Sequence, residues 1–154
     1  MRNELLPVVP LLALLLTACD PGGLNTGVGE PSANPFGCTI RPNDPHLSTH
    51  AAQKGERRIN AQVTIRCEHP ATDVSVTSVL YRRDAGHWTE IDRGTGKAAT
   101  LKAGNKLGAN ANAPCAPGTY ETRGLAAATL PDGRHVKTEK ELVSKQITNP
   151  CDKR

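Results

Sequence analysis

The clearest strand in this chain reads Ile59-Asn60-Ala61-Gln62-Val63-Thr64-Ile65-Arg66-Cys67. Apolar and polar residues alternate strictly along it. Because successive side chains of a strand point to opposite faces, one face carries the apolar set, Ile59, Ala61, Val63, Ile65 and Cys67. This period of two predicts a half-buried β-strand with one face toward a hydrophobic core.

Further strands are predicted on the C-terminal side. Residues 74–82 are rich in β-branched side chains, Asp84-Ala85-Gly86 reads as a turn, and 87–91 return as a hairpin partner, with a short strand at 99–101. Residues 102–118, rich in Gly, Asn and Pro, are predicted to be mostly loop. Residues 120–130 form a strand, Pro131-Asp132-Gly133 a hairpin turn, and 134–148 its return limb. About seven strands at this spacing indicate an all-β fold, a small immunoglobulin-like β-sandwich.

The composition limits which residues can form the core and indicates which partners to expect. The chain of 154 residues has one Trp, two Tyr and one Phe, so its core must come mostly from Val, Ile, Leu and Ala. The net charge of +4 is spread without a long basic run. Such a charge suits residence beside anionic lipid or wall polymer and argues against a nucleic-acid partner.

The N-terminus has the three parts of a signal peptide: Arg2, an apolar run over 5–16, and small residues before Cys19. The run is shorter than the ~20 residues of a membrane-spanning helix and contains two prolines. Leu16-Thr17-Ala18-Cys19 resembles a bacterial lipobox. That resemblance implies a diacylglycerol on Cys19, cleavage just before it, and a location on the outer face of the cytoplasmic membrane. The alternative is an ordinary secretory signal with a chance cysteine near the cut.

The sequence therefore predicts that the chain has three parts. They are a lipoprotein signal peptide over 1–18, a lipidated N-terminus with a disordered tether over 19–37, and a β-sandwich domain over 38–154. The tether is predicted because 20–37 are rich in Gly, Pro, Asn and Ser and show no periodicity.

Cysteine usage fits an oxidising compartment. Once Cys19 is lipidated, an even set remains, Cys38, Cys67, Cys115 and Cys151. Three connectivities are open. We favour Cys38–Cys67 and Cys115–Cys151, because each pair brackets a segment with its own hairpin signals. A metal site is disfavoured because no two of these cysteines have the C-x-x-C spacing, and we expect no metal and no cofactor.

Catalytic motifs are weak throughout. His46 and His50 have a metal-binding spacing but are predicted to lie in a Pro-rich surface loop without a helix. Gly94-Thr95-Gly96-Lys97 fails the phosphate-loop pattern and is interpreted as a flexible turn. Asp92, Glu139 and Glu141 are the candidates for a pair of carboxylates, but Glu139 and Glu141 are expected to share one face of a solvated strand edge. We therefore predict a protein that is not an enzyme.

Trp88 and Tyr81 are the candidate binding residues, because aromatic side chains are common anchors in interfaces and a hairpin would bring these two together. The alternative interpretation, which we prefer, is that Trp88 fills the thin core.

The assembled motifs carry a family resemblance. They are the lipobox, the polar tether, Pro45-His46-Leu47-Ser48-Thr49-His50, Arg58-Ile59-Asn60, Cys67 and Cys115-Ala116-Pro117-Gly118-Thr119-Tyr120. Together they resemble small secreted or lipid-anchored proteins of actinobacteria and their phages, a group of no established activity. The expected function is a lipid-anchored binding protein at the cell surface, contacting an envelope protein or wall polymer. The resemblance also implies an alternative, a phage-encoded lipoprotein that excludes superinfecting phage. A surface enzyme acting on the cell wall is the third alternative.

Overall fold

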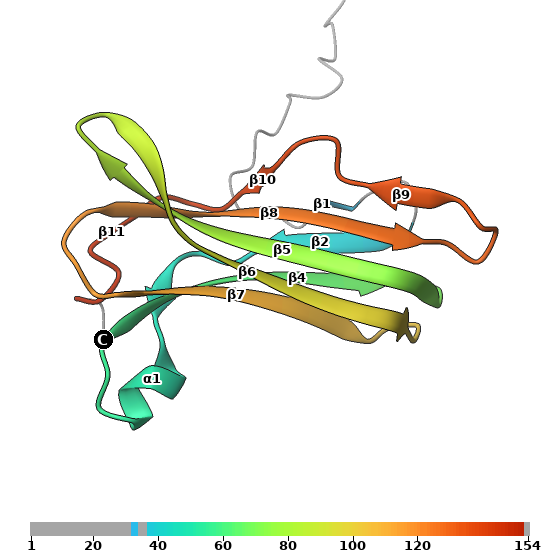
Figure 1. The fold of residues 1–154 in the computed structure, drawn as a ribbon, viewed down its shortest axis with the longest axis horizontal. Helices are drawn as coiled ribbons and strands as arrows, with labels where there is room; N and C mark the ends of the chain where they lie inside the picture. The colour runs from blue at the N-terminus through green and yellow to red at the C-terminus, as the bar shows by residue number, and fades with distance from the viewer. Residues whose placement is uncertain (1–31, 34–36, 153–154) are drawn as a thin grey trace, which may run out of the picture.

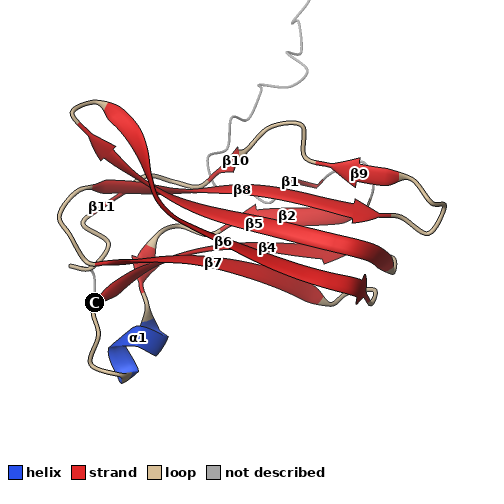
Figure 2. Cartoon of the chain, viewed as in Figure 1, coloured by secondary structure: helices blue, strands red, loops and turns tan. Residues whose placement is uncertain are grey.

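A computed structural model of the chain describes residues 32–33 and 37–152. It shows two antiparallel β-sheets packed face to face, with one short helix at the end of the sandwich (Figures 1 and 2). The predicted all-β sandwich is confirmed. The signal peptide and Cys19 lie outside the described residues. Inside the predicted tether, Ser32–Ala33 form β1, which pairs with β2.

The first sheet has five strands and is centred on β4. On one side of β4 (Arg58–Cys67) lie β2 (Cys38–Pro42) and β3 (His46–Leu47), with β1 outside β2. On the other side lies β7 (Lys106–Pro114), which pairs with β4 from Arg58↔Pro114 to Arg66↔Lys106 without a register shift. The strand quoted first in the sequence is therefore the middle of this sheet.

The second sheet has six strands and is centred on β5 and β8. The long hairpin of β5 (Ala71–Asp84) and β6 (His87–Leu101) forms one side. On the other side, β8 (Thr119–Thr129) pairs with β5, and then with three short strands, β9 (His135–Lys137), β10 (Leu142–Val143) and β11 (Ile147–Thr148). The single return limb predicted over 134–148 is thus broken into three pieces.

Strand connectivity is that of an immunoglobulin-like sandwich. The chain places β2, β4 and β7 in one sheet, and β5, β6, β8 and the β9–β11 segments in the other. Tyr120, at the start of β8, is buried, and its hydroxyl donates a hydrogen bond of 2.9 Å to the carbonyl of Ala116. This is the tyrosine corner that marks the same position in such sandwiches.

The core is built from small and β-branched side chains, as the composition requires. Inward residues of β4 and β5 meet between the sheets, and β7 and β8 contribute mostly alanine. Gly124 of β8 gives Val63 of β4 its space, since a methyl on Gly124 would lie 2.8 Å from a Val63 methyl. Both core clusters and both disulfides found in the described residues lie between Cys38 and Cys151.

The prediction of a loop over 102–118 is wrong, because β7 occupies Lys106–Pro114. Its alternation is built from weak strand formers. Alanines at 109, 111 and 113 point inward and are buried, while Gly108 and Asn110 point outward. Ala, Asn and Gly are depleted in strands generally. A prediction from residue propensities therefore misses this strand, although its buried and exposed positions alternate.

Gly94-Thr95-Gly96 is not a flexible turn. It lies inside β6, at the place where β6 crosses over β7. A methyl on Gly94 would fall on the carbonyl of Asn110, and one on Gly96 on the carbonyl of Gly108. The two glycines therefore let the backbones of the two sheets touch along one side of the sandwich.

Two smaller predictions are also corrected. Residues 49–53 form a helix, α1 (Thr49–Gln53), because the Ser48 hydroxyl caps it by accepting from the Ala51 amide at 3.2 Å. Glu139 and Glu141 lie between β9 and β10 and share no strand face.

Candidate interaction surface

Both predicted disulfides are present, Cys38–Cys67 and Cys115–Cys151. Cys38 and Cys67 are direct register partners on β2 and β4. Cys115 follows β7, and Cys151 follows β11, so the second bridge ties the C-terminal segment to the end of the first sheet. The two bridges therefore take structural roles at the two ends of β4, and their four thiols are used.

The outward face of β6, β5 and β8 carries a cluster of aromatic and charged side chains, which we call the Tyr81 cluster. Its members are Tyr81, Trp88, Glu90, Arg93, Glu121, Arg123 and Glu141. The β5–β6 hairpin that supplies four of them projects past the rest of its sheet (Figure 1). A two-residue turn closes this hairpin, with positive φ at Ala85 and Gly86, as the predicted turn requires.

Arg123 is the centre of the Tyr81 cluster. Its guanidinium stacks over the Tyr81 ring at 4.1 Å from the centroid and forms ion pairs with Glu121 at 2.7 Å and Glu141 at 3.4 Å. Burial acts to lower the pKa of Arg123, but the hydrogen bonds to Glu121 and Glu141 outweigh it and raise the pKa. Glu121 is only 3% exposed, and Gln146 approaches its other oxygen at 3.5 Å. The side chain of Arg123 is thus fixed in place by three neighbours.

A bulge in β6 adds Glu90 and Arg93 to the Tyr81 cluster. Leu80 pairs with Asp92 but Tyr81 pairs with Glu90, so β6 has one extra residue there. In a regular strand residues three apart face opposite sides. The bulge turns Glu90 and Arg93 to the same side, where they form an ion pair of 2.7 Å. The hydrogen bond from Arg93 lowers the pKa of Glu90, and the same bond raises the pKa of Arg93.

Trp88 does not fill the core. It is half-buried, belongs to neither core cluster, and pairs with Arg83 two residues beyond the Tyr81–Glu90 pair. Tyr81 and Trp88 therefore lie diagonally on one face, within reach of a common ligand. The prediction that Trp88 fills the core is wrong, because Trp88 lies opposite Arg83 on the same outward face as Tyr81 and Glu90.

Other predicted site residues are scattered. His46 lies on β3 and His50 on α1, and within 37–152 no three His, Cys, Asp or Glu side chains come together as metal ligands. Asp92 is engaged as an acceptor for the backbone N–H of Asn112 at 2.7 Å. The described residues thus bring together an aromatic and ionic surface, and they assemble no catalytic pair from the candidates named in the sequence.

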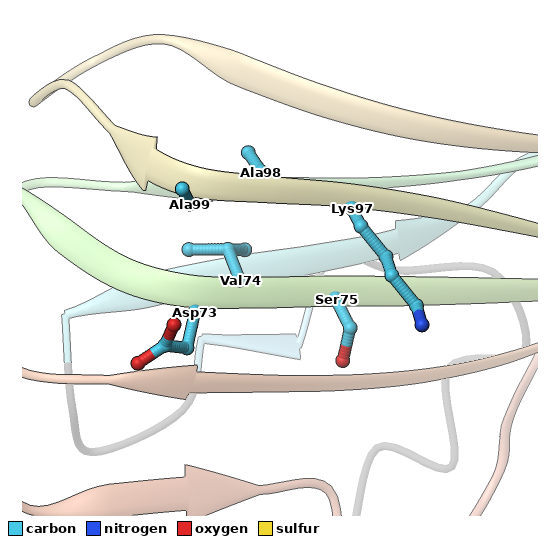
Figure 3. A pocket seen from close by; sticks show the side chains of 6 residues that line it. All are labelled: Asp73, Val74, Ser75, Lys97, Ala98 and Ala99. Carbon is cyan, nitrogen blue, oxygen red and sulfur yellow. The ribbon is translucent and has the colours of Figure 1, made fainter.

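A shallow depression of about 420 Å³ lies beside a second bulge, where β5 shifts its register against β8. Asp73, with a positive φ of 48°, Ser75 and Lys97 direct their polar ends to the same side of the sheet, while Val74, Ala98 and Ala99 form the apolar part (Figure 3). It is wide and open, so it offers a ligand few enclosing contacts.

Sequence reasoning named Tyr81 and Trp88 but missed Arg123, Glu121 and Arg93. The strand prediction over 120–130 already contained the signal for two of them. Once Tyr120 points inward, strict alternation sends Glu121 and Arg123 outward beside Tyr81. The sequence could not predict on which face of the sheet Arg93 lies, because that face depends on the bulge in β6.

Comparisons with known proteins identify no family for this chain. No family model matches this chain, and no curated protein matches it. Among solved structures, the crystal structure of the ApaA protein from Bordetella pertussis is similar, at 15% sequence identity and a TM-score of 0.49, over 80% of this chain and 100% of that one. In the described residues, no helix is both long and apolar enough to cross a bilayer.

Proposed function

We propose that this protein is a lipid-anchored binding protein, held at the outer face of the cytoplasmic membrane through Cys19, and that it acts by contact and not by catalysis. The lipobox-like sequence supports the anchor. The two disulfides support an oxidising compartment. A diacylglycerol supplies two acyl chains, which is what stable anchoring needs.

The Tyr81 cluster carries the binding part of this proposal. Tyr, Trp and Arg are the side chains most enriched at interface hot spots. Here they lie on a rigid antiparallel sheet, with Arg123 already fixed by Glu121, Glu141 and the Tyr81 ring. Binding would therefore lose little side-chain entropy. The exposed Val143, across from Arg123 on β10, adds an apolar contact to the same face. We propose a protein of the cell envelope as the partner.

Metabolic labelling tests the anchor. Cells expressing the wild-type chain are expected to incorporate radiolabelled palmitate into it and to retain it in the membrane fraction. The Cys19→Ala variant is expected to lose the label and appear in the soluble fraction. Equal labelling of the two proteins would refute lipidation at Cys19.

Site-specific photo-crosslinking tests the surface. A photoreactive amino acid at Trp88 is expected to give a discrete adduct in intact cells, because the Tyr81 cluster contacts its partner. The same probe at Thr100, exposed on β6 at the end opposite the hairpin, is the matched control and is expected not to give that adduct. An adduct that survives Arg123→Ala and Tyr81→Ala unchanged, or that forms from both probe positions, would place the partner elsewhere.

A further inference from the structure

The outward face of the first sheet has an unusual charge composition. Every outward position of β2, β4 and β7 is neutral or basic, and none is acidic. The cations are Arg41 on β2, Arg58 and Arg66 on β4, and Lys106 on β7. In the part of the chain that the structure describes, Arg41, Arg66 and Lys106 form no ion pair.

Two of these cations are set directly against each other. Arg66 and Lys106 are register partners on β4 and β7, and both are exposed. Like charges directly opposite in an antiparallel pair destabilise the sheet. Glu68, two residues beyond Arg66, is exposed, and among the described residues it forms no ion pair with either cation. An external anion between Arg66 and Lys106 would relieve this repulsion.

Side-chain amides fill the middle of the same face. Gln62 and Asn110 are register partners, and the Gln62 amide donates to the Asn110 carbonyl oxygen at 3.2 Å. Asn43 in turn donates to Gln62 at 2.9 Å. Asn60 and Asn112 form the next opposed pair. Each amide both donates and accepts hydrogen bonds, so a fixed row of amides matches a row of hydroxyl groups.

The shape of the face suits an extended ligand. The β4–β7 ladder runs from Arg58↔Pro114 to Arg66↔Lys106 with no bulge. At about 3.4 Å per residue it is about 30 Å long. It carries no aromatic side chain on its outward positions, which disfavours single-stranded nucleic acid, since that ligand is bound by base stacking. It also carries no large apolar side chain to enter a lipid layer.

We propose that this face binds an anionic, hydroxyl-rich polymer of the cell envelope, a chain of polyols joined by phosphodiesters. Arg66 and Lys106 contact its phosphates, and the amide row of Asn60, Gln62, Asn110 and Asn112 contacts its hydroxyls. This second surface goes beyond the protein contact assigned to the Tyr81 cluster, and it lies on the other sheet.

Binding of poly(glycerol phosphate) tests this proposal. The chain from residue 19 onward, with Cys19→Ser so that no lipid is attached, is titrated with the polymer at low and moderate salt. We expect the Kd to rise at least tenfold in the double variant Arg66→Ser with Lys106→Ser. The matched control is Lys97→Ser with Lys137→Ser, which removes two cations from the other sheet, and its Kd is expected to change less than twofold. Equal weakening in both variants, or no binding by the wild type, would overturn the proposal.

A second arm separates polyol recognition from charge alone. Gln62→Ala with Asn110→Ala is expected to weaken binding of poly(glycerol phosphate) severalfold and to leave binding of inorganic polyphosphate unchanged, because only the first polymer has hydroxyl groups. Parallel losses for both polymers would refute the role of the amides. Palmitate labelling of Cys19 is independent of these results, so the anchor and this surface can fail separately.

The stability of the free protein gives a third readout. Lys106→Gln removes the like-charge pair with Arg66, so the urea midpoint is expected to equal or exceed that of the wild type while polymer affinity falls. A lower midpoint together with unchanged affinity would mean that Lys106 serves the fold and not a ligand.

Discussion

Two neighbouring side chains of β8 differ in how their buried hydroxyl groups are satisfied. The Tyr120 hydroxyl donates to the Ala116 carbonyl at 2.9 Å. The Thr122 hydroxyl is fully buried and has no hydrogen-bond partner among the described residues. A hydrogen bond contributes about 0.5–1.5 kcal/mol net, whereas a buried polar group without a partner costs about 1–3 kcal/mol.

Removing these two hydroxyls should therefore have different effects on the free energy of unfolding. We expect Tyr120→Phe to lower the free energy of unfolding by about 1 kcal/mol, because the tyrosine corner loses its bond. Thr122→Val keeps the shape of the side chain and is expected to leave the free energy unchanged or to raise it. Urea denaturation with unchanged m-values measures both.

Tyr81→Phe is the control for the first substitution. The Tyr81 side chain contacts Arg123 through its ring, and its hydroxyl forms no hydrogen bond with the described residues. It should leave the urea midpoint near that of the wild type. A Thr122→Val variant destabilised by more than about 1 kcal/mol would show that this hydroxyl is satisfied, for instance by a buried water.

Among the elements, the crossing of β6 over β7 depends on two glycines. Gly94 and Gly96 lie against the backbone carbonyls of Asn110 and Gly108, so an added methyl must push two strands apart. We expect Gly96→Ala to lower the free energy of unfolding by about 1–3 kcal/mol, the usual cost of overpacking. Thr95→Ala, at the exposed position between the two glycines, should have a small effect. The two variants are compared by thermal unfolding, and equal melting temperatures would contradict the close contact.

The strands differ in how well the sequence predicts them, and β4 and β7 show why. β4 alternates Ile and Val with polar residues, and both hydropathy and propensity favour a strand. Its partner β7 presents alanines inward, and its backbone lies against Gly94 and Gly96 of β6. Residues 106–114 form a strand because they pair with β4 and pack against β6, and not because of their own strand propensity. The Tyr81 cluster divides in the same way: alternation places Arg123, whereas a bulge places Arg93.

Across the whole molecule, the two disulfides close loops of similar length but hold different parts of the structure. The sequence separations are 29 for Cys38–Cys67 and 36 for Cys115–Cys151, so loop-closure entropy assigns each about 3.5–4 kcal/mol. Cys38 and Cys67 join strands that already pair over five positions. Cys151 instead follows β11, which pairs with β8 at only two positions.

We therefore expect the two double variants to lose similar global stability but to differ in local opening. In Cys115→Ala with Cys151→Ala, amide hydrogen exchange at Thr148 and Asn149 should become much faster. Without the bridge, the C-terminal segment is held to the rest of the domain by the short β11 ladder, the Thr119–Thr148 and Asn149–Gly118 hydrogen bonds and the bond from Arg57 to the Cys151 carbonyl. In Cys38→Ala with Cys67→Ala, exchange at those amides should stay near the wild-type rate under native conditions, because the lost bridge lies in the other sheet. Equal acceleration in both variants would mean that the C-terminal segment opens only with the whole domain, and that the Cys115–Cys151 bridge acts on the unfolded chain alone.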